Sequence, residues 1–193
     1  MSTATGKLII LSAPSGTGKS TAVASLCALM PQLQVSVSCT TRPKRPQEQE
    51  GKDYFFLTEA EFRARMAAGD FAEWAQVHGN FYGTPKAPLE EVLGSSRVML
   101  LDLDVQGGMQ LKKAFPQAVS IFLLPPSFEV LQERLQGRAT DSPEQIRLRL
   151  ENAKRELEYQ NFYDYCVVND DLEQAVRDIA KIIRKVSPSY GAH

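Results

Sequence analysis

The chain has 193 residues, 43% of them hydrophobic, which is enough for one domain with a sizeable core and perhaps a small insertion. It carries 22 lysines and arginines against 23 aspartates and glutamates, so no overall basic field favours nucleic acid or an anionic membrane, and we expect a small-molecule partner. No apolar run approaches the roughly 20 residues of a membrane span, and three scattered cysteines indicate neither a zinc site nor a disulfide framework, which favours a cytoplasmic protein.

The stretch from Leu8 to Ser20 predicts a buried strand, a tight loop and the start of a helix. Four apolar residues precede Ser12-Ala13-Pro14-Ser15-Gly16-Thr17-Gly18-Lys19-Ser20. This pattern is typical of a phosphate-binding loop, whose backbone N–H groups surround phosphate oxygens while the lysine reaches the β- and γ-phosphates and the final hydroxyl binds Mg²⁺. The usual first glycine is Ala13 here. The alternative is a glycine-rich turn that caps an ordinary helix.

A polar loop with two prolines is expected after the first helix. The helix is predicted over 21–30, where Pro31 ends it, and a second strand over 35–38. The prolines in 40–48 cannot lie in a helix interior, so this stretch should be an exposed loop. Its cations allow two interpretations, a solvated basic turn or an anion site, and composition alone favours the turn.

The next segment predicts a small mixed insert. Strands are expected over 53–57, 71–77 and 80–84, and Thr58 with Glu61 forms a capping box for a helix that ends at Ala68. We expect Ser38–Thr84 to form an acceptor domain. The aromatic residues Phe55, Phe71 and Trp74 are interpreted as core packing.

Two carboxylates end the following apolar strand. After a helix over 86–93, the run 98–104 predicts a buried parallel strand that delivers Asp102 and Asp104 to its carboxyl edge, where ligands bind in open α/β sheets. These acids could be simple turn residues, but a phosphate loop in the same chain favours a role toward Mg²⁺.

Alternation of strand and helix continues to the end of the chain. Gln106 opens a helix, 119–124 is a strand, Ser127 caps a helix through Leu135, a long helix runs from about 141 to 160, and a strand over 165–168 precedes a helix over 172–186. Five arginines gather near the long helix: Arg134, Arg138, Arg147, Arg149 and Arg155. The interleaved Glu151, Glu156 and Glu158 indicate that a solvated helix face accounts for some of them.

Taken together, these residues resemble the guanylate kinases, which transfer a phosphoryl group from ATP to GMP. The resemblance extends from about Lys7 to Arg184. It rests on the phosphate loop and on five further motifs in the family's order: Ser38 with Thr41-Arg42, Arg45, Glu48, Gly51 and Tyr54; Glu73-Trp74-Ala75 with Tyr82-Gly83-Thr84; Leu101-Asp102-Leu103-Asp104-Val105-Gln106-Gly107; Arg134-Leu135-Gln136-Gly137-Arg138; and Val168-Asn169-Asp170-Asp171-Leu172.

The resemblance implies an α/β fold of the P-loop NTPase type, with a parallel sheet flanked by helices, a small mixed GMP-binding insert and a helical lid. The implied core comprises 1–37, 85–135 and 161–193, the insert 38–84 and the lid about 136–160. The implied reaction is direct in-line transfer from ATP to GMP, and to dGMP, assisted by Mg²⁺ and without a covalent intermediate.

The same resemblance assigns site residues. The implied ATP-binding residues are Ala13, Pro14, Ser15, Gly16, Thr17, Gly18, Lys19, Ser20, Thr21, Arg134, Arg138 and Asn169. The implied GMP-binding residues are Ser38, Arg42, Arg45, Glu48, Tyr54, Glu73, Tyr82, Thr84 and Asp104. The implied catalytic residues are Lys19, Asp102, Arg138 and Arg149, and the implied Mg²⁺ ligands are Ser20 and Asp102, partly through water.

The chain departs from the family pattern at several positions, and two other functions compete. The loop motif loses a glycine at Gln47, Thr84 replaces the commoner serine and Ala139 follows Arg138, so loop shape, affinity and lid mobility could differ. One alternative is a non-catalytic guanylate-kinase-like interaction module, which the intact Gly18-Lys19-Ser20 opposes. The other is a kinase for a different phosphorylated acceptor, which Glu73 and Asp104 oppose.

Overall fold

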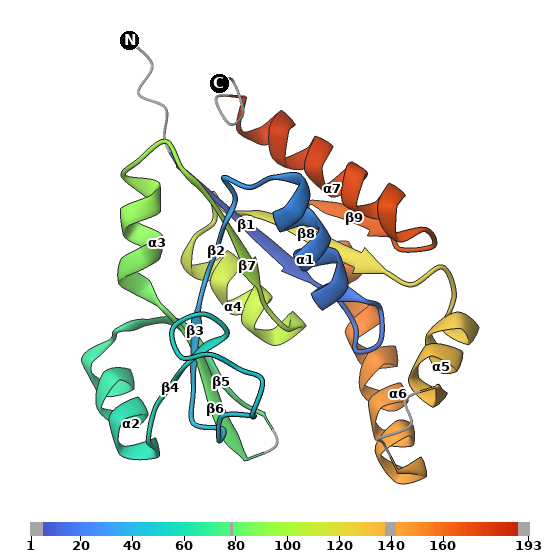
Figure 1. The fold of residues 1–193 in the computed structure, drawn as a ribbon, viewed down its shortest axis with the longest axis horizontal. Coiled ribbons are helices and arrows are strands. Elements are labelled where there is room, and N and C mark those ends of the chain that lie inside the picture. Colours follow the sequence, from blue (N-terminus) through green and yellow to red (C-terminus); the bar gives the residue numbers. More distant parts are fainter. Residues whose placement is uncertain (1–5, 78, 138–141, 189–193) are drawn as a thin grey trace.

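The computed structural model describes residues 6–77, 79–137 and 142–188, which form two sheets and the helices around them (Figure 1). The strands are β1 (Lys7–Ser12), β2 (Gln34–Val35), β3 (Ser38–Thr40), β4 (Tyr54–Phe56), β5 (Phe71–Val77), β6 (Asn80–Pro85), β7 (Val98–Asp102), β8 (Val119–Leu124) and β9 (Tyr165–Val168). The α-helices are α1 (Lys19–Leu29), α2 (Glu59–Ala68), α3 (Lys86–Leu93), α4 (Val105–Ala114), α5 (Phe128–Gln136), α6 (Pro143–Leu157) and α7 (Leu172–Val186), and a 3₁₀ helix spans Glu158–Phe162.

The first sheet has five parallel strands in the order β2-β7-β1-β8-β9. Strands β7 and β2 lie on one side of β1, and β8 and β9, which come later in the chain, lie on its other side. In sheets of this kind, ligands bind beyond the carboxyl ends of the strands at the position where the strand order reverses. The loop that follows β1 lies at this position, and the register places Leu11 opposite Asp102 of β7. The parallel sheet flanked by helices confirms the expected fold class.

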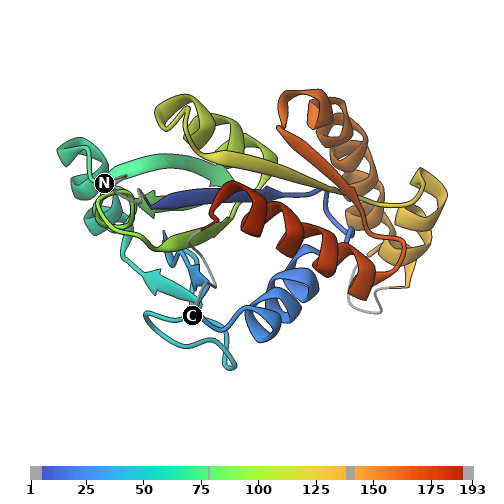
Figure 2. The ribbon, with the colours of Figure 1, turned by 90° about the horizontal axis from the view of Figure 1, so that it is seen from above.

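Helices cover both faces of this sheet because β1 is apolar on both sides. Successive strand residues point to opposite faces. Ile9 and Leu11 belong to a core cluster with residues of α1 and α7, whereas Leu8 and Ile10 belong to a second cluster with residues of α3 and α4. Figure 2 shows α1 and α7 on one side of the sheet and α4 on the other. Two buried layers therefore hold β1 and the loop that follows it.

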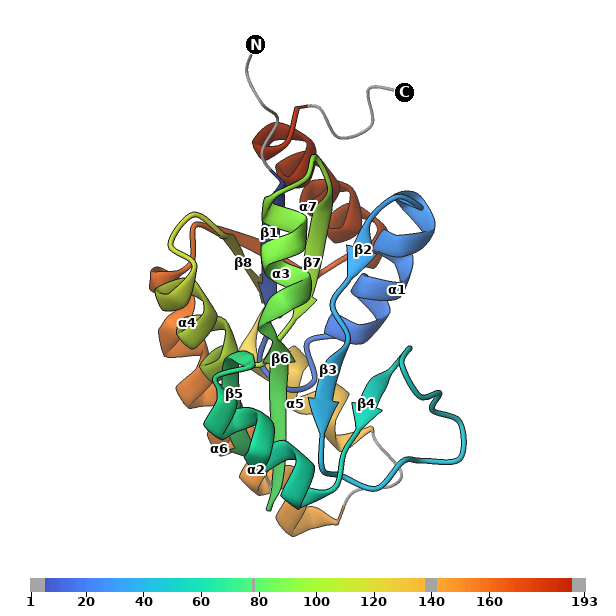
Figure 3. The same ribbon diagram turned by 90° about the vertical axis from the view of Figure 1, so that its left-hand side faces the viewer.

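The second sheet has four strands in the order β4-β3-β6-β5 and is packed against α2 (Figure 3). The predicted capping box is present, because the Thr58 hydroxyl accepts the Glu61 N–H and the Glu61 carboxylate accepts the Thr58 N–H. Phe62 of α2 stacks on Phe71 and Phe81. The core of this sheet is therefore small and aromatic.

Two of the three aromatic residues interpreted as core packing are exposed, and that interpretation was wrong for them. Phe55 and Trp74 are 37% and 41% exposed. Trp74 makes only an edge contact with the Phe81 ring among the aromatic contacts of the described residues, whereas Phe71 packs into the cluster as expected. Trp74 pairs with Gly83 on the same face as Phe81, which α2 covers, but it lies on the edge strand β5 and outside the buried cluster of that face.

The predicted single strand over 35–38 is two short strands in different sheets. Val35 pairs with Leu100 in the first sheet, and Ser38 pairs with Tyr54 in the second. The chain passes from one sheet to the other at residues 36 and 37. Similarly, the strand predicted over 98–104 ends at Asp102, because Asp104 is the N-cap of α4.

Helices α5 and α6 pack against each other around Leu131, Leu135 and Ala153, which are fully buried. Figure 1 shows this pair on the opposite side of the molecule from α2 and the second sheet. The long helix predicted to about residue 160 ends at Leu157 and continues as the 3₁₀ helix. Within the described ranges, no helix is both long and apolar enough to cross a membrane.

Candidate active site at the carboxyl edge of the sheet

The loop after β1 has two glycines in the left-handed region, Gly16 with φ 88° and Gly18 with φ 94°. Glycine adopts this conformation without the steric cost that a Cβ would add. Space imposes the same choice, since a Cβ on Gly16 would lie 2.8 Å from Leu135 and one on Gly18 would lie 2.9 Å from Asn169 Nδ2. Gly18 is the N-cap of α1, so the loop leads directly into a helix N-terminus, where backbone N–H groups and the helix dipole favour anions.

Two predicted nucleotide-binding residues contact the loop backbone itself. The buried Asn169 donates from Nδ2 to the Thr17 carbonyl at 2.7 Å, and Arg134 donates to the carbonyls of Thr17 and Asn169 at 3.5 and 3.1 Å. Asn169, directly after β9, and Arg134 of α5 thereby hold the loop from the side of its carbonyl groups. Their predicted contact with nucleotide stays a prediction.

Lys19 is held at the carboxyl end of β7. Its Nζ lies 2.6 Å from Asp102 Oδ1 and also donates to the Leu103 carbonyl. The Lys19 and Asp102 side chains are 20% and 32% exposed, so this ion pair is partly open to solvent and to a ligand. The register of β1 with β7 explains the pairing, because it aligns the starts of both loops.

The residues predicted to hold Mg²⁺ face the same space. Ser20 and Asp102 line one cavity, where Asp102 Oδ1 is the oxygen paired with the Lys19 ammonium group. Hydroxyl and carboxylate oxygens are ligands that suit a hard cation such as Mg²⁺. The described residues contain no cluster of three or more His, Cys, Asp or Glu side chains that could hold a metal. Mg²⁺ is typically bound through one or two protein oxygens, with water and substrate phosphates as its other ligands.

A cavity of about 290 Å³ lies between the two sheets. It brings together residues predicted for both substrates, and the lining side chains among them are Lys19, Ser20, Ser38, Tyr54, Glu73, Tyr82, Asp102 and Asp104. A second cavity of about 320 Å³ is lined by the loop, with Lys19, Ser20 and Asp104 shared between the two. The site therefore consists of two adjoining cavities with one set of charged groups between them.

Glu73 is a buried carboxylate at the wall of the first cavity, with only 7% of its surface exposed. Thr84 Oγ1 donates to Glu73 Oε1 at 2.6 Å. Burial, together with the nearby Asp104 charge, raises the pKa of Glu73 to about 7. Gly107 leaves room for it, since a Cβ there would lie 3.0 Å from Glu73 Oε2.

Asp104 has a local structural role in addition to facing the cavities. Its Oδ1 accepts the Gly107 N–H at 2.7 Å and caps α4. The Ser12 hydroxyl donates to its backbone carbonyl at 3.2 Å. Both contacts fix the Asp104 carboxylate between the two cavities.

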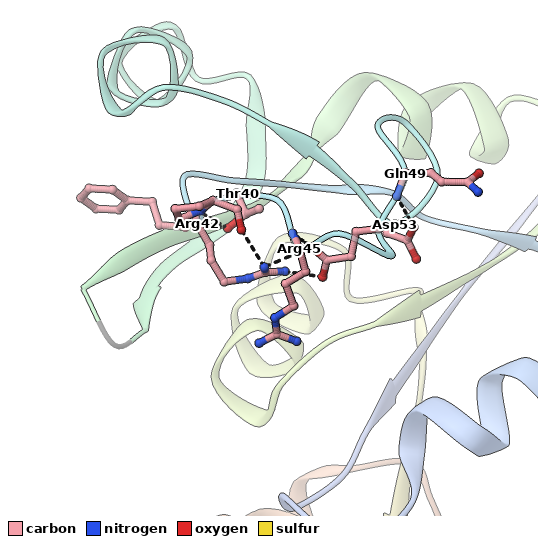
Figure 4. A network of polar contacts seen from close by, with 8 residues as sticks. Thr40, Arg42, Arg45, Gln49 and Asp53 are labelled. Carbon is pink, nitrogen blue, oxygen red and sulfur yellow. Dashed lines mark hydrogen bonds and ion pairs between the residues drawn. The ribbon is translucent and has the colours of Figure 1, made fainter. Parts of the chain in front are cut away.

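The basic loop after β3 is organised around an ion pair. Arg42, labelled with Arg45 in Figure 4, donates from both terminal nitrogens to the Glu48 carboxylate, at 3.1 and 2.6 Å. Its guanidinium also lies over the Tyr54 and Phe56 rings. Hydrogen bonding to Glu48 raises the pKa of Arg42, and the same contact lowers the pKa of Glu48. Glu48 thus organises the loop and also accepts the backbone N–H of Arg45.

The remaining residues of the predicted GMP phosphate site are divided between cavity and surface. Ser38, Tyr54 and Tyr82 line the first cavity, and the Tyr54 and Tyr82 rings meet edge to face. Burial, with the Asp102 charge as a second cause, raises the pKa of Tyr54. Arg45 lies in the exposed part of the loop and does not line this cavity.

Of the two predicted catalytic arginines after α5, the structure describes one. Arg149 of α6 lines a third cavity, of about 520 Å³, which faces Gln76 and Asp104. Arg138 lies outside the described residues.

The sequence interpretation missed Glu156. It was grouped with Glu151 and Glu158 on a solvated face, which is wrong, because Glu156 lines the loop cavity and accepts the Ser15 N–H at 3.2 Å. A signal was present in the sequence, since Glu156 lies seven residues, or two helical turns, after Arg149 and so shares its face of α6.

Comparison with known proteins gives one answer. A family model described as guanylate kinase matches residues 5–186. The guanylate kinase of Dechloromonas aromatica is 46% identical over 97% of this chain and 93% of its own length, and that of Rhizobium meliloti is 49% identical over 92% of this chain and 82% of its own. A crystal structure of guanylate kinase from Anaplasma phagocytophilum superposes with a TM-score of 0.78 at 34% identity, covering 95% of this chain and 87% of the other.

Proposed function

Because the chain belongs to the guanylate kinase family, we propose that its two adjoining cavities hold the two substrates of one phosphoryl transfer. The enzyme uses ATP to phosphorylate GMP. In our assignment the loop cavity takes the phosphates of ATP, and the cavity between the sheets takes GMP. The single observation that carries this assignment is that Lys19, Ser20 and Asp104 line both cavities.

The phosphates of ATP would lie in the loop that contains Gly16 and Gly18. Its backbone N–H groups and the N-terminus of α1 supply donors, and Lys19 supplies a positive charge. In the structure Lys19 is paired with Asp102, so a phosphate would compete for its ammonium group or share it. The contacts of Asn169 and Arg134 with the Thr17 carbonyl support the loop in the shape that this role requires.

The phosphate of GMP would be bound by Ser38, Tyr54, Tyr82 and Arg42. A guanidinium and two phenolic hydroxyls are planar or directional donors suited to a dianionic phosphate. Arg42 is already oriented by Glu48 and by the Tyr54 ring, which reduces the entropy lost on binding. Arg45 would join them only after movement of its exposed loop.

Glu73 would read the guanine base. Guanine presents N1–H and an exocyclic amino group side by side, and an ionised carboxylate is the side chain with two adjacent acceptors. The donor on Thr84 orients Glu73, and Gly107 leaves the second oxygen accessible to the cavity. Adenine offers an acceptor at N1 and no amino group at C2, so AMP would add no donor to the buried carboxylate beyond that of Thr84.

Phosphoryl transfer of this class needs a divalent metal, and we assign its protein ligands to Ser20 and Asp102. When bound, Mg²⁺ would neutralise part of the phosphate charge and orient the phosphates. The partly exposed Asp102 carboxylate lines the same cavity as Ser20, which supports the assignment.

The protein groups then act by position and charge. Lys19 meets charge on the transferring phosphoryl group, and Arg149, with Arg138, would approach it from the side of α6. The attacking GMP oxygen is already ionised, so no general base is needed. Asp104, fixed by its hydrogen bonds, separates the two substrates and keeps their reacting ends aligned.

A steady-state assay with ATP and a panel of GMP, dGMP, AMP, CMP and UMP tests the assignment. We expect GMP and dGMP to be the substrates, with kcat/KM for GMP exceeding that for AMP by roughly 10⁴-fold, as expected of a site with a required hydrogen bond. Comparable turnover of a pyrimidine nucleotide would contradict the base-reading site, and binding without turnover would indicate a non-catalytic module.

Glu73→Gln sharpens the same test. The amide replaces one acceptor by a donor that faces a donor, so we expect a strongly raised KM for GMP, a smaller GMP to AMP ratio of kcat/KM and unchanged ATP binding. Glu90→Gln is the matched control, because Glu90 pairs with Lys86 on the exposed surface of α3. An unchanged GMP to AMP ratio of kcat/KM in Glu73→Gln would contradict recognition of guanine by Glu73, and Asp104 would be the next residue to test.

We also propose a cytoplasmic location. Its support is that Cys27, Cys39 and Cys166 are all free thiols, as reducing compartments favour.

A further inference from the structure

Glu156 places a carboxylate in the cavity formed by the phosphate-binding loop. It lies in the last turns of α6 and reaches across 141 positions of sequence, where its Oε2 accepts the backbone N–H of Ser15 at 3.2 Å. Both residues are half-buried. This is a contact between α6 and the loop that makes one of the loop's own N–H groups unavailable.

The surroundings of Glu156 are those of an anion site. The cavity of about 320 Å³ that Glu156 lines also contains the backbone of Gly16 and Gly18 and the side chains of Lys19 and Asp104. Burial is the main cause that raises the pKa of Glu156, and the Asp104 charge adds to it, while the Ser15 N–H and the Lys19 ammonium act in the opposite direction. The carboxylate therefore lies near enough to both charges to interact with each of them.

A phosphate chain in this cavity would meet Glu156 directly. The backbone N–H groups of such loops are donors to phosphate oxygens, and the Ser15 N–H already has a carboxylate acceptor. Two anions that share a partly buried space repel each other more strongly than they would in water. Glu156 therefore has to release the Ser15 N–H before that group can donate to a phosphate oxygen in the cavity.

We propose that Glu156 is an internal competitor of the nucleotide phosphates, which occupies the Ser15 N–H until ATP displaces it. The proposal rests on the assigned function of the loop as the ATP phosphate site. Because Arg149 is on the same helix, two turns earlier, displacement of Glu156 would free α6 to reposition this arginine when ATP is bound. Occupancy of the loop would in this way be coupled to the position of a predicted catalytic group.

The charge of Glu156 and its hydrogen bond can be separated by substitution. Glu156→Gln keeps an oxygen that can accept from Ser15 and removes the negative charge, so the fold should be retained. Glu156→Ala removes both. Glu151→Gln is the matched control, since it makes the same charge change on α6 at a carboxylate that pairs with Arg147 and is 51% exposed.

Calorimetric titration of each protein with ADP and with GMP is the decisive measurement. We expect both Glu156 variants to bind ADP about three- to tenfold more tightly than the parent protein, which is the range for loss of a partly exposed charged competitor. GMP affinity should not change, and Glu151→Gln should match the parent protein for both ligands. Adenosine, which lacks phosphate, should bind all four proteins equally.

Equal or weaker ADP binding by Glu156→Gln would overturn the proposal and make Glu156 a support of the nucleotide-bound loop. Hydrogen exchange of the Ser15 amide, measured by NMR without nucleotide, provides a second test, because Glu156→Ala should exchange faster than the parent protein. An unchanged exchange rate of the Ser15 amide in Glu156→Ala would show that Glu156 does not accept the Ser15 N–H, and would overturn the proposal. If the parent protein itself bound neither ADP nor GMP, the assigned function would fail instead, so the two failures are distinguishable.

Discussion

The Lys19 side chain is already held in position for phosphoryl transfer before substrate binds. Its ammonium group is held by the Asp102 carboxylate and the Leu103 carbonyl at the end of β7, and it lines both cavities. Asp102 is partly exposed, and Leu103, which is a core residue, contributes only its backbone carbonyl. The contribution of Lys19 to stability should therefore be small, since partly exposed ion pairs are worth about 1 kcal/mol or less.

We predict that Lys19→Ala lowers kcat by at least about 10²-fold, the scale for loss of one transition-state charge contact, while the melting temperature changes little. Turnover by a coupled assay and thermal unfolding would be measured together. Lys181→Ala is the control, because Lys181 pairs with Asp178 on the exposed side of α7. Near-normal kcat in Lys19→Ala would disprove its role in transfer.

Glu73 should make GMP binding depend on pH. Its pKa is raised to about 7, mainly by burial, so a large fraction is protonated at pH 6 and most is ionised at pH 8. Only the ionised form accepts both guanine donors. We therefore expect KM for GMP to fall as pH rises through about 7 and to level off above it, by up to tenfold per pH unit below the pKa.

The Glu73→Gln variant is the control for this pH profile. The GMP phosphate also titrates, at about pH 6 for a phosphate monoester, and the variant retains this contribution while it loses that of Glu73. The difference between the two profiles belongs to Glu73. Identical profiles for parent and variant would show that Glu73 does not exchange a proton when GMP binds.

At the scale of elements, the phosphate-binding loop is held by helices and strands from distant parts of the chain. Leu135 of α5 packs where Gly16 has no side chain, and Asn169, directly after β9, bonds the Thr17 carbonyl next to Gly18. A loop with two left-handed glycines would otherwise sample many conformations. These contacts provide the rigidity that a phosphate site needs.

Asn169→Ala should therefore lower the free energy of unfolding by about 1–3 kcal/mol, the cost of removing a buried hydrogen-bond partner, and raise KM for ATP without changing KM for GMP. Denaturant unfolding and steady-state kinetics would measure the two effects. Asn161→Ala, at an exposed position of the 3₁₀ helix, is the control. An equal rise in both KM values would indicate general damage to the site rather than loss of loop support.

At the scale of the whole molecule, two sheets meet along the cavity that Glu73 and Asp102 line. The second sheet extends from the end of β2 to the start of α3, and α5 with α6 stands on the other side (Figures 1 and 3). The shared residues Lys19 and Asp104 show that the two cavities adjoin each other. A single ligand of suitable length should therefore occupy both.

We predict that a dinucleoside polyphosphate joining adenosine to guanosine binds at least about 10²-fold more tightly than ATP, because the second binding event becomes intramolecular. Competitive inhibition against each substrate would measure the affinity. The diadenosine compound of the same phosphate number is the control, since it lacks the guanine that Glu73 would read. Equal affinity for both compounds would show that the guanine end is not engaged.

The sequence alone determined most of the local structure and the family. The apolar run before Gly18-Lys19-Ser20, the capping box of Thr58 and Glu61 and the strand before Asp102 were all found where expected, because each depends on residues within one or two turns of each other. The motif order gave the guanylate kinase resemblance, which the comparisons confirmed.

Only the tertiary structure decided which surfaces meet. Val35 and Ser38 belong to different sheets, Trp74 is exposed, Asn169 faces the back of the phosphate-binding loop and Glu156 its cavity. Local pattern predicts that a residue lies on one face of a helix or strand, but what covers that face depends on chain segments up to 152 positions away. Burial, the raised pKa of Glu73 and the competitor at Ser15 all arise from that long-range packing.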